Sequence, residues 1–153
     1  MFLTKSRNKK VLMAVDMANL LMQNHMGFLK RLESLEQFDM TECDNEDIVS
    51  FMKDRYLNSI QEVKTKRYWN PFSKAIASYN PKYPNTITLN SRRLGRTVDS
   101  IVGTILHEAV HLTDHYYQSV SFGHGDNSPI GKENTAPFKI GEVAKQHCIE
   151  HID

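Results

Sequence analysis

The chain lacks the features that mark several common classes of protein. It has only two cysteines, Cys43 and Cys148, which are too few for a disulfide framework or a four-thiolate zinc site. No run approaches the ~18 apolar residues needed to span a bilayer, and no glycine-rich phosphate loop or internal repeat occurs. The 19 Lys and Arg residues nearly balance the 18 Asp and Glu residues, so no bulk charge draws the chain to nucleic acid or to an anionic membrane.

The composition that is present is that of one compact globular domain. The 153 residues are 40% hydrophobic and 24% charged, which argues against a disordered or coiled-coil chain and leaves little room for a second core. We therefore expect a single domain over residues 1–153. The compositional feature that needs explaining is the presence of seven histidines.

The N-terminal segment has some features of a signal peptide. Its basic start, MFLTKSRNKK, is followed by the apolar run VLMAV, but Asp16 and Asn19 interrupt the apolar region and no small-residue cleavage site follows. We therefore expect no signal peptide. A cytoplasmic location agrees with this expectation, although the sequence specifies no compartment.

Hydrophobic periodicity predicts an α+β fold, with N-terminal helices, a short antiparallel sheet, one strong helix and a C-terminal helix. The predicted helices cover residues 10–35, 45–61, 98–117 and 138–149. The predicted strands cover residues 62–69, 74–79 and 86–90, separated by Asn-Pro and Pro-Asn turns. Asp44 is the expected cap of the second helix, and Thr97 or Asp99 that of the third. We expect Tyr68 and Trp69 to pack in the core rather than to form a substrate pocket.

The strongest predicted helix contains His107-Glu108-Ala109-Val110-His111. Residues four apart lie on one helical face about 6 Å apart along the axis, so both imidazoles can reach one metal ion, with Glu108 on the solvent side of the ion. This is the two-histidine, one-base arrangement of zinc hydrolases. In a chain of this composition the pattern is expected by chance roughly 0.02 times.

Two other interpretations of this helix stay open. His107 and His111 could be a buried core pair, although burying two imidazoles and a carboxylate without a metal costs several kcal/mol unless each group finds a partner. Alternatively, His111 and His115 with Asp114 resemble the inverted HxxEH pattern, with Asp in place of Glu. If His107 and His111 are the zinc ligands, Asp114 has two possible roles. It accepts a hydrogen bond that orients a ligand imidazole, or it belongs with His115 to an exposed helix end.

A catalytic zinc usually takes three protein ligands and a water, so one more ligand is required. His124 is the first candidate, because Gly123 and Gly125 permit a sharp turn and the chain after the helix is long enough to return to the metal. Asp126 in the same loop is the second candidate, and Glu142 in the predicted C-terminal helix is the third.

The stretch from residue 86 to residue 126 resembles the zincin metallopeptidases, because the HExxH motif lies on a helix that follows a strand. The resemblance does not select a family within the zincins: the third histidine of the metzincins is replaced by Tyr117, and the signatures of the other branches are incomplete. It implies one bound Zn²⁺, Glu108 as general base, and a substrate peptide paired with strand 86–90 if that strand is at a sheet edge. The candidates for stabilising the oxyanion are His115, Tyr116, Tyr117 and Lys139.

We therefore expect a zinc metallopeptidase that acts on a peptide or protein substrate, with no nucleic-acid partner and an unspecified oligomeric state. The basic cluster at residues 92–96 is short and has no interleaved aromatic residues, so we interpret it as a solvated loop. Two alternatives share the same ligands: a metal-dependent hydrolase of a non-peptide amide, and a non-catalytic zinc-binding domain.

Overall fold

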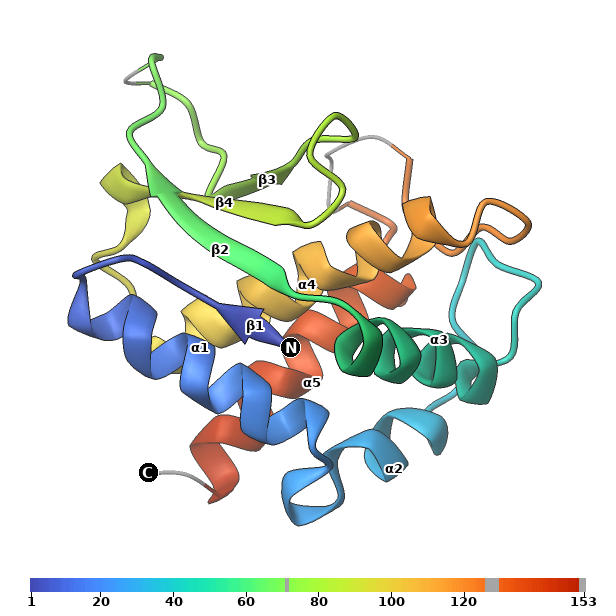
Figure 1. Ribbon diagram of the computed structural model, residues 1–153. Coiled ribbons are helices and arrows are strands. Elements are labelled where there is room, and N and C mark those ends of the chain that lie inside the picture. The colour runs from blue at the N-terminus through green and yellow to red at the C-terminus, as the bar shows by residue number, and fades with distance from the viewer. Residues whose placement is uncertain (71, 126–129, 152–153) are drawn as a thin grey trace.

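A computed structural model describes residues 1–70, 72–125 and 130–151 of the chain (Figure 1). Within these residues the chain is α+β, as expected, with helices and a small mixed sheet. The elements in chain order are β1 (Phe2–Leu3), α1 (Lys9–Met22), the 3₁₀ turn η1 (His25–Gly27), α2 (Phe28–Glu33), α3 (Asn45–Asn58), β2 (Gln61–Lys66), β3 (Ala77–Tyr79), β4 (Thr86–Asn90), the 3₁₀ turn η2 (Ser91–Arg93), α4 (Val98–Tyr116) and α5 (Ala136–His151).

The sheet has the strand order β1-β2-β4-β3, and the expectation of an antiparallel sheet was wrong. Strands β1 and β2 pair in parallel, as do β2 and β4, and only β3 pairs antiparallel with β4. Alternation along a strand specifies which side chains are buried, but it does not specify the direction of the neighbouring strand. Strand β4 lies inside the sheet with Ile87 and Leu89 buried, so the edge strand of this side is β3 and not strand 86–90.

The predicted N-terminal helix is interrupted. Helix α1 ends at Met22, and Asn24, Met26 and Gly27 have φ values of 62°, 48° and 75°, in the left-handed region that cannot continue an α-helix. Apolar residues continue at helical spacing beyond the break because α2 also buries one face, including Phe28 and Leu32. Periodicity alone therefore did not reveal the turn.

Helix α4 lies at the centre of the molecule, below the sheet, and also contacts α1, α3 and α5 (Figure 1). It crosses α5 at Gly103 and Gly141, where a Cβ atom added to Gly103 would lie 2.5 Å from the Gly141 carbonyl oxygen. A Cβ atom added to Gly141 would lie 2.8 Å from the Gly103 carbonyl oxygen and 3.3 Å from the His107 Cβ atom. Only glycine fits at this crossing, and the crossing brings the start of α5 next to the histidine motif.

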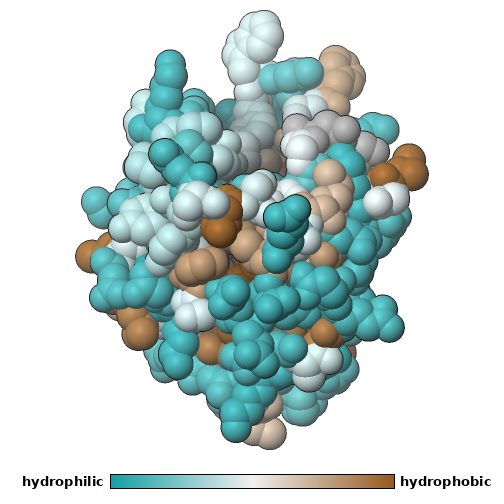
Figure 2. Space-filling view, turned by 90° about the vertical axis from the view of Figure 1, so that its right-hand side faces the viewer, coloured by the Kyte–Doolittle hydropathy of each residue, from teal (hydrophilic) through white to brown (hydrophobic). Residues whose placement is uncertain are grey.

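Strand β2 stops at Lys66, and the expected core position of Trp69 was wrong, because its side chain is 96% exposed. Phe72 is also exposed, whereas Tyr68 is half-buried. The face of the molecule turned to the viewer in Figure 2 is largely hydrophilic, with scattered hydrophobic residues. Of the helices that the structure describes, none combines the length and the apolar character needed to cross a bilayer.

Candidate metal centre

Three imidazoles converge beside helix α4. His107 and His111 lie one turn apart on α4, and His124 comes from the segment that folds back after the helix. The Nε2 atom of His124 lies 2.9 Å from Nε2 of His111 and 3.3 Å from Nε2 of His107. Two nitrogens that bind one tetrahedral ion at about 2.0–2.1 Å are about 3.3 Å apart. The three side chains can therefore hold a metal ion. His124, the first candidate for the third ligand, is the residue that joins the two helical histidines.

The surroundings keep two of these imidazoles in the form that binds a metal. Burial, followed by the neighbouring imidazoles His111 and His124, lowers the pKa of His107 to about 3. Burial and the neighbouring His124 lower the pKa of His111 to about 4. Near neutral pH both rings are therefore uncharged, and a neutral imidazole nitrogen is the atom that ligates a metal.

The start of α5 forms one wall of the centre. The ring of Phe138 lies 4.7 Å, between centroids, from the rings of both His107 and His124. The backbone carbonyl of Pro137 accepts a hydrogen bond from His107. Because Nε2 of His107 faces His124, the donor in this bond is Nδ1–H, which fixes the tautomer and the ring orientation. Neither residue was among the predicted site residues, although the sequence indicated a helix start near Pro137 in a segment that could either line the site or only connect.

The segment that carries His124 is anchored to the end of α4 by Asp114. The backbone N–H of Phe122 donates to the Asp114 carboxylate at 2.7 Å, and the Phe122 ring is fully buried. A Cβ atom added to Gly123 would lie 2.9 Å from Asp114 Oδ2 and 4.0 Å from His111 Nδ1. Asp114 therefore positions the backbone next to His124, and its predicted role in orienting a ligand imidazole stays a prediction.

Glu108 follows His107 directly on α4 and is buried, with 8% of its surface exposed. Burial raises the pKa of its carboxyl group to about 7, and a hydrogen bond from the backbone N–H of Tyr79 acts in the opposite direction. A buried carboxyl group with a pKa close to neutral can accept a proton and return it, which is the requirement for a general acid and base.

The hydrogen bond from Tyr79 puts Glu108 at the outer edge of strand β3. Asn90 N–H donates to the Ile76 carbonyl at 2.9 Å, so Ile76 and, by alternation, Ser78 face β4 with their backbone groups. The backbone groups of Ala77 and Tyr79 then face the opposite edge, where the described part of the chain places no further strand.

The remaining predicted site residues lie elsewhere. Glu142 is exposed on α5 and accepts a hydrogen bond from Gln146, and Asp126 lies outside the described residues. His115 is exposed, with its ring 5.6 Å from that of Tyr79. Neither Glu142 nor His115 belongs to the group of described residues that could share one metal ion.

The two tyrosines at the end of α4 turn to helix α3. The guanidinium group of Arg55 lies 4.2 Å from the ring centre of Tyr116, and the hydroxyl of Tyr117 donates to Asp54. Tyr68, which was expected to pack in the core, lies closer to the metal centre than these two tyrosines. Its hydroxyl donates to the Thr88 carbonyl at 3.0 Å. Burial is the main cause of the raised pKa of Tyr68, and the charge of Glu108 also contributes to it.

Comparison of the chain with known protein families, with characterised proteins and with solved structures finds no match. The site must therefore be interpreted from its own geometry.

Proposed function

We propose that this protein is a zinc-dependent hydrolase of the zincin type, which cleaves peptide bonds with Glu108 as the general base. The observation that carries the proposal is the buried Glu108 carboxyl group, which follows His107 of the three-imidazole cluster on α4 and is bonded to the outer edge of a strand. Structural metal sites have no need of such a group, whereas hydrolysis requires one.

The donor set supports zinc as the metal. Among the described residues it consists of the imidazoles of His107, His111 and His124, a ligand set that suits zinc and leaves a fourth position for water. When bound there, zinc supplies Lewis-acid chemistry that polarises a carbonyl group and lowers the pKa of a coordinated water toward neutrality.

The protein's own part in the reaction is to move one proton. Glu108, ionised, accepts the proton of the attacking water and passes it to the nitrogen of the leaving amine. In the metal-free protein burial raises the pKa of this group to about 7, which makes its carboxylate a stronger base than an exposed glutamate. The Tyr79 N–H holds the carboxylate in place between the two transfers.

The edge of β3 supports an extended peptide as the substrate. The outward backbone groups of Ala77 and the outward carbonyl of Tyr79 can pair with a peptide backbone, and the Tyr79 N–H bond to Glu108 keeps this edge next to the base. A peptide bound here would lie along α4 and cross the metal centre. In this proposal the substrate pairs with β3, and not with β4 (strand 86–90) as the resemblance to the zincins had implied.

The proposal is tested by metal analysis of the purified protein together with a peptide-cleavage screen of wild type, Glu108→Gln and Glu142→Gln. We expect about one zinc per chain in all three proteins, and a loss of activity of about 10²- to 10⁴-fold in Glu108→Gln alone. Glu142→Gln is the matched control, because that carboxylate is exposed on α5. Zinc binding with activity unaffected by Glu108→Gln would exclude the proposed base, and zinc binding without any activity would favour a non-catalytic zinc domain.

A further inference from the structure

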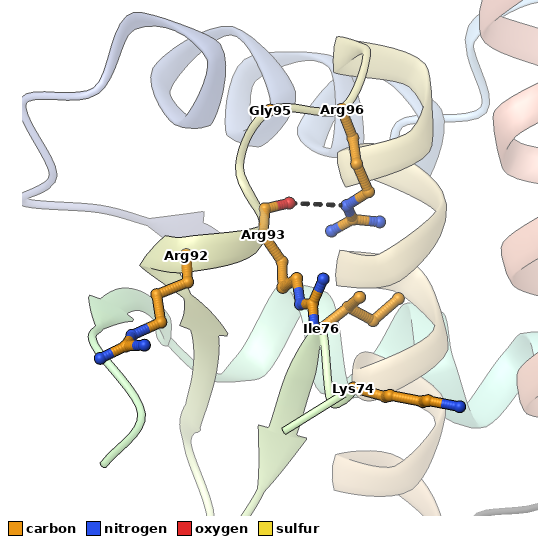
Figure 3. Close-up of a pocket in the computed structure, with 6 residues that line it drawn as sticks. All are labelled: Lys74, Ile76, Arg92, Arg93, Gly95 and Arg96. Carbon is orange, nitrogen blue, oxygen red and sulfur yellow. Dashed lines mark hydrogen bonds between the residues drawn. The ribbon is translucent and has the colours of Figure 1, made fainter. Parts of the chain in front are cut away.

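A pocket of about 380 Å³ lies where the chain leading into β3 meets η2 and the start of α4 (Figure 3). Its lining is basic, and consists of Lys74, Ile76, Arg92, Arg93, Gly95 and Arg96. In Figure 3 the side chains of Arg93 and Arg96 point into the space between η2 and α4, with Ile76 beneath them, whereas Arg92 points away from both.

The positive charge of this pocket is not neutralised within the described part of the chain. None of the ion pairs among the described residues involves its arginines or Lys74. Arg96 Nη2 is buried and has no hydrogen-bond partner among those residues. Burial alone lowers the pKa of Arg96, with no carboxylate acting against it. Lys74 and Arg93 are exposed, and their charge, without a carboxylate partner among the described residues, favours an anionic ligand.

The arginines are also held in place. Arg96 donates from Nη1 to Thr104 Oγ1 at 2.8 Å and from Nε to the Arg93 carbonyl at 3.0 Å, and Arg93 Nη2 donates to the Ser73 carbonyl at 2.8 Å. These bonds tie η2 to α4 and to the lead-in of β3. The segment at residues 92–96 is largely exposed, as expected, and these bonds hold Arg93 and Arg96 in place within it.

The peptide proposed above, if extended along β3, would reach this pocket. Thr104 precedes His107 by three residues, or about 4.5 Å along α4. Ile76 precedes Tyr79 by three residues, or about 10 Å along β3. Antiparallel pairing is the more stable kind per residue, and a peptide antiparallel to β3 would run with its C-terminal end toward Ile76. The pocket would then receive a residue about three or four positions beyond the cleaved bond on its C-terminal side.

We propose that this pocket binds a carboxylate of the substrate peptide, on the C-terminal side of the bond that is cleaved, through Lys74, Arg93 and Arg96. The inference rests on the proposed function, because that function brings the peptide to the pocket. The carboxylate belongs either to an Asp or Glu side chain or to the C-terminus of the peptide, and both sources have the same chemistry. The enzyme would therefore select substrates by an acidic group downstream of the scissile bond.

The first test measures binding of labelled peptides to zinc-loaded Glu108→Gln protein by fluorescence anisotropy. The peptides are matched in sequence and carry Glu in the C-terminal half, Glu in the N-terminal half, or no Glu, each with a free or an amidated C-terminus. We expect about five-fold tighter binding when a carboxylate is present in the C-terminal half, and a smaller preference at high salt. Preference for the amidated peptide with C-terminal Glu identifies a side chain as the source, and preference for the free C-terminus alone identifies the terminal carboxylate.

The second test removes the pocket's exposed charges. Added to Glu108→Gln, the pair Lys74→Gln and Arg93→Gln should abolish the preference, while Lys53→Gln, which removes an exposed charge from α3, should keep it. Arg96 is left in place because its bonds hold α4. Equal binding of all peptides, preference for N-terminal Glu, or preference that survives the double substitution would each overturn the inference.

Cleavage by the wild type separates the inference from the proposed function. Mass spectrometry of a digested peptide mixture gives the residues beyond each cleaved bond. Cleavage with no acidic preference there overturns the inference and leaves the peptidase intact. Pocket-dependent binding of acidic peptides without any cleavage supports the anion site and contradicts the peptidase. A further outcome is that inorganic phosphate displaces all the peptides to the same extent, with no preference among them. That result would show an anion site that does not select substrates, and it would overturn the inference.

Discussion

The substitution Glu108→Gln in the metal-free protein isolates the energetic effect of burying one carboxyl group. Glutamine has nearly the shape of protonated glutamic acid but does not titrate. At a pH where Glu108 is protonated, the two proteins should therefore have similar free energies of unfolding. As the pH rises they should diverge, because only the wild type contains a carboxyl group that resists losing its proton in the folded state.

The sign and size of this divergence follow from the pKa. Burial raises the pKa of folded Glu108 from 4.5 to about 7, so between these values the folded wild type binds more protons than the unfolded chain. Its stability then falls as the pH rises, by about 1.4 kcal/mol per pH unit relative to the glutamine variant. Over the window of about 2.5 units the variant should gain about 3 kcal/mol in relative stability.

The other buried groups of the site do not disturb this comparison. The lowered pKa values of His107 and His111, about 3 and 4, make both proteins lose stability as the pH falls below about 6.5, because the unfolded chain takes up protons first. That contribution is common to the two proteins and cancels in the difference.

Urea unfolding at about pH 5, 6 and 7, in the presence of a chelator, measures the free energy of unfolding of each protein. The expected result is a difference in free energy that grows with pH in favour of Glu108→Gln. Parallel pH profiles would refute the reasoning, because they would mean that Glu108 titrates at an ordinary carboxyl pKa and is not buried next to the histidines.

Two further substitutions test how the site is positioned. Asp114→Ala removes the acceptor that anchors the segment of His124 and should weaken metal binding about 10- to 100-fold, measured by competition with a chelating dye; an unchanged affinity would show that the anchor is dispensable. Gly103→Ala puts a Cβ atom 2.5 Å from the Gly141 carbonyl oxygen and should lower the free energy of unfolding by about 1–3 kcal/mol, despite the higher helix propensity of alanine. Gly95→Ala is its control, since a Cβ atom there meets nothing within 4 Å, and equal stability of the two variants would contradict the close crossing.

Local patterns were sufficient to predict the helical part of the site. Two histidines at helical spacing, in a helix with a strong apolar face, specify their own geometry, and the bounds of α4 and β4 agree with the periodicity. His124 followed from chain length and from two glycines, which limit where the segment after α4 can go. These features depend only on residues close together in the sequence.

The remaining features depend on contacts between distant segments, and no local pattern encodes them. The parallel pairing of β2 with β4 is decided by where the chain between them lies, so the order of the sheet and its edge at β3 were missed. Phe138 and the Tyr79 N–H reach the site from α5 and β3, through packing that starts with the glycine crossing of α4 and α5. The interruption after α1 is an exception: Asn24 and Gly27 are residue types that favour its left-handed backbone, but the apolar spacing that continues into α2 concealed the break.

The central claim is that His107, His111 and His124 together form a metal centre, and equilibrium dialysis against zinc at neutral pH tests it most directly. Wild type and His115→Ala should each retain one zinc per chain, because the His115 side chain is exposed and lies outside the cluster. His124→Ala should lose the ion at the same free zinc concentration. Zinc binding by His124→Ala with the affinity of wild type, or loss of zinc from His115→Ala, would contradict the account.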